Sequence, residues 1–321
     1  MKNTNDESTT QTRHEGWERE MLERLAFAAV TEQRRARRWS IFFKLFFAIY
    51  FLFLLFLLAA DNIGGPAMAS RYTALVELDG EISSESLASA DNVITGLRHA
   101  FEDTAAAGVI IRANSPGGSP VQAGYIYDEI KRLRLKYPKT PLYGVVTDMC
   151  ASGCYYALAA ADKIYADRSS VVGSIGVLMN GFGFVETLKK VGVERRLLTA
   201  GEHKSFLDPF SPLTPADRKR AEAILNNVHQ QFIERVRAGR GQQLKETKEL
   251  YSGMFWTGDE AQKLGLIDEF GSASFVAREV IGAEEIVDFS VREGVFDRFT
   301  RRLGSAMTQV PGIKLTAPQL R

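Results

Sequence analysis

One segment, Pro141-Leu142-Tyr143-Gly144-Val145-Val146-Thr147-Asp148-Met149-Cys150-Ala151-Ser152-Gly153-Cys154-Tyr155-Tyr156, indicates the architecture of this chain. Its first six residues have the apolar pattern of a buried strand, and the alanine-rich run from Tyr155 to Ala161 is typical of a helix. Ser152 therefore lies where a strand gives way to a helix. A serine at such a junction holds its hydroxyl above the sheet, beside the partly positive N-terminus of the helix.

Two interpretations of Ser152 are open. Its small neighbours Ala151 and Gly153 leave room for a substrate backbone, as a nucleophilic serine requires. Serine is also strongly favoured at helix N-caps, where its hydroxyl only accepts a backbone hydrogen bond. The rest of the chain has to distinguish a nucleophile from a cap.

Strand-like and helix-like stretches alternate on both sides of this segment. Strands are predicted at 74–78, 108–113, 141–146, 163–166 and 194–199, and helices at 86–103, 121–135, 155–161, 184–191 and 215–237. Such repeated β-α units predict an α/β fold with a largely parallel sheet. Residues 72–290 are enough for one domain with its own core, and residues 291–321 are a basic tail without a clear pattern.

A membrane anchor is predicted from Ile41 to Ala60, an apolar run that would span roughly 30 Å as a helix. Four arginines between Arg34 and Arg38 precede it, which predicts that residues 1–40 are cytoplasmic. Residues 61–71 form a linker to the domain outside. The alternative is a cleaved signal peptide, since Ala67-Met68-Ala69 resembles a cleavage site, but the leading segment and the apolar run are both long for one.

Composition excludes some function classes. The net charge is +1, and the arginine cluster is explained by membrane orientation, so no basic stripe indicates nucleic-acid binding. The two cysteines, Cys150 and Cys154, straddle Ser152, where a bridge would distort the junction; we expect reduced thiols. Their spacing makes a poor metal site.

A nucleophilic serine also needs backbone donors for the oxyanion that forms during acyl transfer. The loop Asn114-Ser115-Pro116-Gly117-Gly118-Ser119 follows the strand at 108–113, and its paired glycines allow amides to face a substrate carbonyl. Gly117 and Gly118 are the candidate donors, together with the amides beside Ser152, including that of Gly153. An ordinary Pro-Gly turn is the alternative.

The general base is ambiguous from the residues alone. His14 precedes the anchor, and His99 and His229 lie in predicted helices. His203 and its neighbour Lys204 lie in a loop. A lysine can act as a base where burial destabilises its ammonium form, and both residues satisfy the general criteria. A solvated surface lysine is the common alternative.

Five segments in order resemble the signal peptide peptidase A family, peptidase family S49, which are membrane-anchored serine proteases with a fold like ClpP and crotonase. The resemblance covers roughly residues 72–280. It is carried by Asn114-Ser115-Pro116-Gly117-Gly118, Ala151-Ser152-Gly153, Gly173-Ser174-Ile175-Gly176, Gly201-Glu202-His203-Lys204 and the run from Trp256-Thr257-Gly258 to Leu264-Gly265-Leu266-Ile267-Asp268. The single anchor and the length are similar to the short, single-domain members.

The resemblance implies a role for each matching residue. Ser152 would be the nucleophile, Lys204 the general base, Ser174 the residue that orients the lysine amine, and Gly117 an oxyanion donor. Two positions depart from the family pattern: Cys154 stands where glycine is common, and His203 stands where tyrosine is common.

The function implied is an endopeptidase outside the cytoplasmic membrane of a bacterium, in the periplasm or beyond, which degrades cleaved signal peptides and misfolded exported proteins. The resemblance further implies a homo-oligomer, contact with lipid through residues 41–60, and no metal or organic cofactor. Two rival functions are an acyl-transfer enzyme like the crotonases and an inactive membrane scaffold on the same fold.

Overall fold

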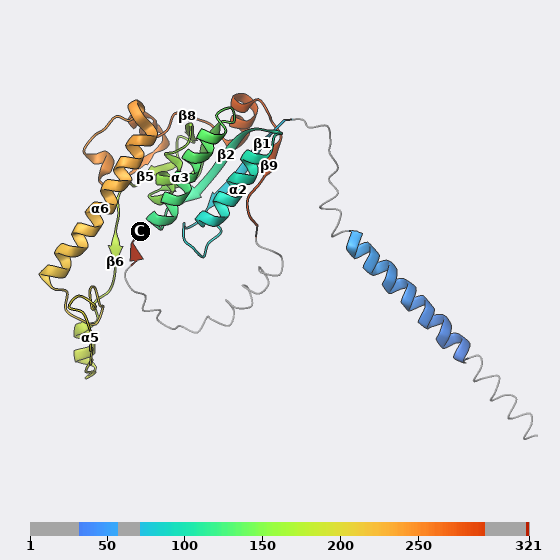
Figure 1. Ribbon diagram of the computed structural model, residues 1–321, viewed down its shortest axis with the longest axis horizontal. Helices are drawn as coiled ribbons and strands as arrows, with labels where there is room; N and C mark the ends of the chain where they lie inside the picture. Colours follow the sequence, from blue (N-terminus) through green and yellow to red (C-terminus); the bar gives the residue numbers. More distant parts are fainter. Residues whose placement is uncertain (1–31, 57–70, 293–318, 321) are drawn as a thin grey trace, which may run out of the picture. The chain divides into compact units, whose positions relative to one another are not determined.

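The computed structural model describes residues 32–56, 71–292 and 319–320 (Figure 1). The chain divides into two compact units, Met1–Ala69 and Ser70–Arg321. In the first unit the described part is one helix, Glu32–Phe56. At about 1.5 Å per residue its 25 residues are long enough to cross a membrane, and their composition is apolar enough. The predicted anchor begins within this helix, and residues 57–60 lie outside the described part.

The second unit is built on one sheet with the strand order β7-β5-β3-β2-β1-β9, to which β4 and β8 are added beside β3. All pairings within it are parallel except that of β5 with β7, so the predicted α/β class is confirmed. The strands are β1 (Tyr72–Asp79), β2 (Ala106–Ser115), β3 (Leu142–Ala151), β4 (Lys163–Ala166), β5 (Val171–Gly173), β7 (Phe255–Thr257), β8 (Glu269–Phe270) and β9 (Ile286–Asp288).

Helices cover both faces of this sheet. Helices α2 (Ala90–Glu102) and α3 (Pro120–Lys136) lie side by side over β1 and β2 (Figure 1). Because side chains alternate along a strand, Val76 and Ile111 belong to the core of this face, whereas Leu75 and Ile110 belong to the opposite face. That opposite face is covered by α8 (Ala273–Phe275) and the π-helical turn η3 (Val276–Ile281).

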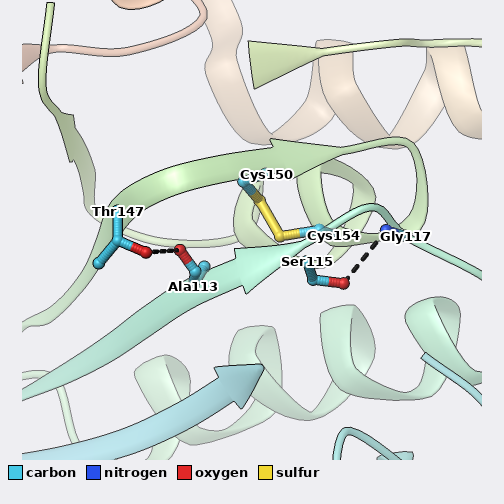
Figure 2. Close-up of a disulfide and its surroundings, with 6 residues drawn as sticks. All are labelled: Ala113, Ser115, Gly117, Thr147, Cys150 and Cys154. Carbon is cyan, nitrogen blue, oxygen red and sulfur yellow. Dashed lines mark hydrogen bonds between the residues drawn. A yellow bond between two sulfur atoms is a disulfide. The ribbon is translucent and has the colours of Figure 1, made fainter. Parts of the chain in front are cut away.

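Strand β3 is irregular beyond the predicted strand at 141–146. It continues to Ala151, past the predicted end at Val146, because its pairing with β2 shifts register: Ala113 is opposite Val146, but Ser115 is opposite Cys150. Its first half pairs with β4 and its last residues pair with β5. The Thr147 hydroxyl donates to the Ala113 carbonyl at 3.2 Å and bridges the irregular region (Figure 2). The bulge therefore moves the end of β3 toward β5.

The remaining helices complete the unit. They are α4 (Gly153–Leu158), α5 (Val185–Lys190), α6 (Pro215–Arg240), α7 (Gly258–Leu264) and the 3₁₀ turns η1 (Gly241–Gln243) and η2 (Glu249–Tyr251). Helix α6 begins with a capping box of Thr214 and Asp217. Its second half buries Phe232 and Val236, but the apolar residues of its first half stay partly exposed. The predicted apolar side of α6 is therefore only half covered.

Residues 181–213, which we term the arm, extend beyond the N-terminal end of α6, with α5 at their tip (Figure 1). The arm is held mainly to itself: the Phe184 amide donates to the Pro209 carbonyl at 2.7 Å, and Arg195 pairs with Asp208. The strand predicted at 194–199 is wrong, because these residues are all exposed and form no pairing with the sheet.

A second, two-stranded sheet lies where the arm begins. Strand β6 (Met179–Asn180) pairs antiparallel with β10 (Gln319–Leu320), from the last residues of the chain (Figure 1). Strand β6 directly follows Leu178. Because β6 pairs with β10, its backbone can accept an extended segment of polypeptide as a partner strand.

Candidate active site

Ser152 lies between β3 and α4, at the junction predicted from the sequence. Its backbone has φ 52° and ψ −122°, which is a costly conformation for a residue other than glycine. Its amide donates to the Gly173 carbonyl at 2.8 Å, and this bond ties the turn to β5. Ser152 occupies the N-cap position of α4, but its side chain makes no capping hydrogen bond, so the hydroxyl is not used as a cap. The hydroxyl is available for chemistry, as on the strained strand-to-helix turns that carry nucleophiles in hydrolases.

Cys150 and Cys154 form a disulfide, so the prediction of reduced thiols is wrong (Figure 2). The physical reason is the turn at Ser152. In an extended strand, residues four apart are about 13 Å from one another. Here the positive φ of Ser152 turns the chain back, and the Cα atoms of the cysteines are 5.2 Å apart, a distance that a disulfide readily spans. Both cysteines are fully buried.

The loop after β2 lies against this turn. Gly117 has φ 94°, and a Cβ atom on it would lie 2.6 Å from the Ala151 carbonyl oxygen and 2.8 Å from Ser152 Cβ. Only glycine fits such a position. The Gly117 amide donates to Ser115 Oγ at 3.1 Å, so its hydrogen-bonding capacity is already used within the loop (Figure 2).

The amides of Gly118 and Gly153 are better candidates for oxyanion donors. A Cβ atom on Gly153 would lie 3.2 Å from the Gly118 nitrogen, so the Gly118 amide is next to the residue that follows Ser152. Within the described residues neither amide donates a hydrogen bond. Two adjacent unengaged amides beside a nucleophile are what a tetrahedral oxyanion requires.

Ser152 opens into a cavity of about 470 Å³. The lining residues are Glu81, Pro116, Gly117, Gly118, Ser152, Ser174, Gly176, Val177, Leu178, Ser252, Gly253 and Phe255. Sequence reasoning missed Ser252, Gly253 and Phe255, which reach the cavity through the antiparallel pairing of β7 with β5. No local signal could have identified them, because they become neighbours of Ser174 only through that pairing.

A much smaller cavity, of about 10 Å³, also adjoins Ser152. Its walls include Tyr156, Val228 and Phe232, and the Tyr156 and Phe232 rings lie 5.0 Å apart. Burial raises the pKa of the Tyr156 phenol above its ordinary value, so the ring is uncharged at neutral pH. This recess is apolar and has room for only a small side chain.

Other polar clusters in the described part of the chain do not form a competing site. A cavity of about 450 Å³, lined by residues of β1, β2 and the edge strand β9, contains Glu77, Arg112, Asp288 and Arg292, but these charges form two ion pairs with one another. Within residues 32–56, 71–292 and 319–320, no group of three or more His, Cys, Asp or Glu side chains is arranged to hold a metal ion.

Ser174 lines the same cavity as Ser152. Its φ is 51°, its amide donates to the Met254 carbonyl at 2.8 Å, and its hydroxyl donates to the Gly253 carbonyl at 3.3 Å. The Ser174 hydroxyl is therefore held by the Gly253 carbonyl on the wall of the cavity that Ser152 also lines.

Lys204 does not line the cavity of Ser152. It lies in the arm, in an exposed turn where its amide donates to the Gly201 carbonyl at 3.2 Å. Among the residues that follow it, Phe206 and Leu207 are only partly buried. One chain alone therefore brings together Ser152, Ser174 and the glycine loop, and leaves Lys204 apart in solvent.

The histidines do not replace it. His203 is exposed next to Lys204, and His99 lies in the last turn of α2. His229 Nε2 lies 3.1 Å from the Ile175 carbonyl oxygen, a structural contact of α6. His14 lies outside the described residues. None of the three described histidines lines the Ser152 cavity.

Comparison with known proteins shows which family the residues of this site resemble. Residues 134–284, which include Ser152, Ser174 and Lys204, match the model of peptidase family S49. The family resemblance seen in the sequence is thereby confirmed.

Three relatives illustrate the range of similar proteins. The chain is 33% identical over 211 residues to protease 4 of Haemophilus influenzae, covering 66% of this chain and 33% of that protein. It is 30% identical over 186 residues to the chloroplastic serine protease SPPA of Arabidopsis thaliana, covering 58% and 27%. It is 46% identical over 186 residues to a Brucella abortus protein named Na(+)/H(+) antiporter NhaA, covering 58% and 25%. The chain thus spans a quarter to a third of the length of these relatives.

Proposed function

Because residues 134–284 of this chain belong to peptidase family S49, we propose that it is a serine endopeptidase with Ser152 as its nucleophile. One observation carries the proposal: an uncapped serine hydroxyl on a strained turn, beside two unengaged backbone amides, at the wall of a 470 Å³ cavity. In the proposed reaction Ser152 Oγ attacks the scissile carbonyl. The amides of Gly118 and Gly153 stabilise the oxyanion, and the acyl-enzyme that forms is then hydrolysed.

We further propose that Lys204 from a second copy of the chain is the general base. Lys204 is exposed and separate from the Ser152 cavity in its own chain, whereas a lysine base needs dry surroundings. The arm around it carries uncovered apolar side chains, among them Phe182, Val193 and Leu198, the last of which is 96% exposed. The first half of α6 is also incompletely covered. Such surfaces favour association with another protein chain. A second copy docked there would cover them and could bring its arm to the cavity.

The lysine then acts twice. Its neutral amine takes the Ser152 proton as Oγ attacks, and it returns this proton to the leaving amine. The same amine activates the water that releases the acyl group. Ser174, on the wall of the cavity, would orient the incoming amine through its hydroxyl, exchanging its bond to the Gly253 carbonyl for one to Nζ.

We propose that the substrates are extended polypeptides, namely signal-peptide remnants and misfolded exported proteins. Support comes from β6, which adjoins the cavity residue Leu178 and takes up residues 319–320 as an antiparallel partner. A peptide substrate could add to the same edge, with main-chain hydrogen bonds that do not depend on its sequence.

The proposed location is the outer side of the cytoplasmic membrane of a bacterium. The helix Glu32–Phe56 would anchor the chain, and the arginines at 34–38 favour a cytoplasmic N-terminus. The Cys150–Cys154 disulfide supports a protease domain outside the cytoplasm, because disulfides persist in oxidising compartments such as the periplasm.

The rival functions are less well supported. A crotonase-like acyl transferase would leave the uncapped Ser152 without a role. An inactive scaffold would not need the costly backbone conformations of Ser152 and Ser174. The antiporter name belongs to a relative of which only a quarter is similar to this chain, and it favours no transport function here.

The proposal is tested with the full chain in detergent micelles. We expect it to hydrolyse unfolded casein, and we expect a fluorophosphonate probe, which reacts with activated serines, to modify Ser152. Peptide mapping by mass spectrometry locates the modified residue. The Ser169→Ala variant, which alters an exposed serine on the loop before β5, is the matched control and should behave like the wild type. Casein hydrolysis with modification of a different serine would contradict the assignment.

The small cavity beside Ser152 makes a separate prediction about the substrate residue preceding the cleaved bond. With Phe232 in place, we expect a preference for alanine or glycine, because larger side chains do not fit in about 10 Å³. Phe232→Val removes part of the wall and should raise kcat/KM for a leucine at this position, relative to alanine, by about 10- to 100-fold. Peptide pairs differing only at that residue measure the ratio. The matched control is Phe289→Ala, which removes a ring that stacks on Tyr72 and does not line the cavity; it should leave the ratio unchanged. An unchanged ratio in Phe232→Val would mean that this recess does not bind substrate.

A further inference from the structure

We propose that the Cys150–Cys154 disulfide is a positioning element for the nucleophile, so that the rate of peptide hydrolysis depends on whether this bond is oxidised. The inference rests on the proposed function of Ser152.

The disulfide encloses the nucleophile within a short covalent ring. Ser152 is the middle residue between the two cysteines, whose Cα atoms are 5.2 Å apart. Its φ of 52° lies in a region that non-glycine residues leave unless their surroundings hold them there. Each cysteine is fixed by its own element, Cys150 by β3 and Cys154 by α4, and both side chains are fully buried. The bond therefore joins the two elements on either side of the strained residue.

Few other interactions hold the turn. The Ser152 amide donates to the Gly173 carbonyl at 2.8 Å, and its carbonyl accepts from the Tyr156 amide at 2.9 Å. Within the described residues no capping bond from its own side chain adds to these. Without the disulfide, these two hydrogen bonds and the packing of the buried neighbours, Gly117 among them, would have to hold a conformation that the residue does not favour.

The disulfide also adjoins the loop that supplies the oxyanion donors (Figure 2). Cys150 is opposite Ser115 in the pairing of β3 with β2. Ser115 Oγ accepts the hydrogen bond of the Gly117 amide at 3.1 Å, and Gly117 contacts the Ser152 turn. A shift of Cys150 would thus move the nucleophile relative to the glycine loop, and catalysis is sensitive to displacements of about 1 Å in such an arrangement.

The chemistry of the switch is a two-electron reduction. A dithiol attacks one sulfur atom, the S–S bond breaks, and a second attack within the mixed disulfide releases the protein. Cys150 and Cys154 become two thiols, and the dithiol becomes its cyclic disulfide. These are the only two cysteines of the chain, so a dithiol can act on the protein's sulfur chemistry at this bond alone.

The test compares the full wild-type chain in detergent before and after reduction by a dithiol, with free thiols counted by a chromogenic reagent in unfolded aliquots, because both cysteines are buried in the folded chain. We expect kcat for a fluorogenic peptide to fall about tenfold on reduction, with KM changed by less than about twofold, because the nucleophile and not the substrate groove is disturbed. The rate of modification of Ser152 by the fluorophosphonate probe should fall in parallel.

Variants separate the bond from the side chains that form it. Cys150→Ala, Cys154→Ala and the double variant should each have the kcat of the reduced wild type, and a dithiol should not change it. Loss of packing alone would instead give single effects that add in the double variant. Equal kcat for wild-type samples with zero and two counted thiols would overturn the inference while leaving the protease intact. Failure of every form, oxidised wild type included, to hydrolyse peptide or to react with the probe would overturn the proposed function and this inference with it.

Discussion

Chains that carry Ser152→Ala and chains that carry Lys204→Ala are each expected to lose peptide hydrolysis by about 10³-fold or more, and an equimolar mixture of the two is expected to regain activity. Each loss follows from removal of a reacting group. The recovery follows from the separation of Lys204 from the Ser152 cavity in a single chain. If each site takes its serine from one copy and its lysine from the next, some sites in a mixed assembly contain both.

The expected size of the recovery can be stated. In a head-to-tail assembly with random mixing, half of the copies retain Ser152 and half of their neighbours retain Lys204, so about a quarter of the sites are complete. The mixture should therefore reach about a quarter of the wild-type rate after subunits have exchanged. Casein hydrolysis by the variants, alone and mixed, measures it.

Two further measurements make this experiment decisive. Lys190→Ala, which alters an exposed lysine of α5 in the same arm, should have wild-type activity alone and should not behave like Lys204→Ala in mixtures. Fluorescence transfer between labelled variants shows that copies have exchanged. A mixture that exchanges subunits and stays inactive would refute a site shared between copies.

Replacing Gly117 by alanine is expected to lower kcat by about 10²-fold or more, although Gly117 supplies no reacting atom. The new Cβ atom would lie 2.6 Å from both the Ala151 carbonyl oxygen and the Gly153 amide nitrogen, and 2.8 Å from Ser152 Cβ. No rotamer relieves such contacts with backbone, so either the loop or the nucleophile turn must move. Both carry the geometry of oxyanion stabilisation, and loss of one oxyanion donor typically costs about 10² to 10³ in kcat.

Gly80→Ala is the matched control for this substitution. Gly80 has φ 83°, close to the 94° of Gly117, but a Cβ atom on it would meet nothing within 4 Å. Alanine at this position therefore has the strain of a positive φ but collides with nothing. We expect it to lower the free energy of unfolding by about 1 kcal/mol. Urea unfolding and kcat, measured on both variants, separate the two effects. Equal kcat for Gly117→Ala and Gly80→Ala would show that contact with the nucleophile turn is unimportant.

Much of the fold could be predicted from local pattern. The strand at 163–166 matches β4 at both ends, and the helices at 121–135 and 215–237 match α3 and α6 within a few residues. These segments have strong periodicity and clear caps, which act over a few neighbouring residues. The strand predicted at 194–199 has the composition of a strand but no partner in the sheet. Composition alone cannot reveal whether a neighbouring strand is present to pair with such a segment.

The candidate site shows the same contrast between features that neighbouring residues reveal and features that they do not. The prediction of reduced thiols failed because of a backbone conformation that is invisible in the residue types. The positive φ of Ser152 brings Cys150 and Cys154 within bonding distance, and the Ser115 hydroxyl occupies the Gly117 amide. Gly118 and Gly153 consequently become the available donors. Ser252, Gly253 and Phe255 join the cavity only because β7 pairs with β5.

The sequence by itself determined the class of fold, the strand-to-helix junction that carries Ser152, the glycine loop beside it and the family to which the matched residues belong. These depend on the identities and spacing of neighbouring residues. Only the tertiary structure decided that the serine hydroxyl is uncapped, that the cysteines are joined, and that Lys204 lies apart from the nucleophile of its own chain. The first two features depend on the backbone conformation of Ser152, which the surrounding domain holds in place, and the third depends on where the arm lies. Residue identities alone reveal neither.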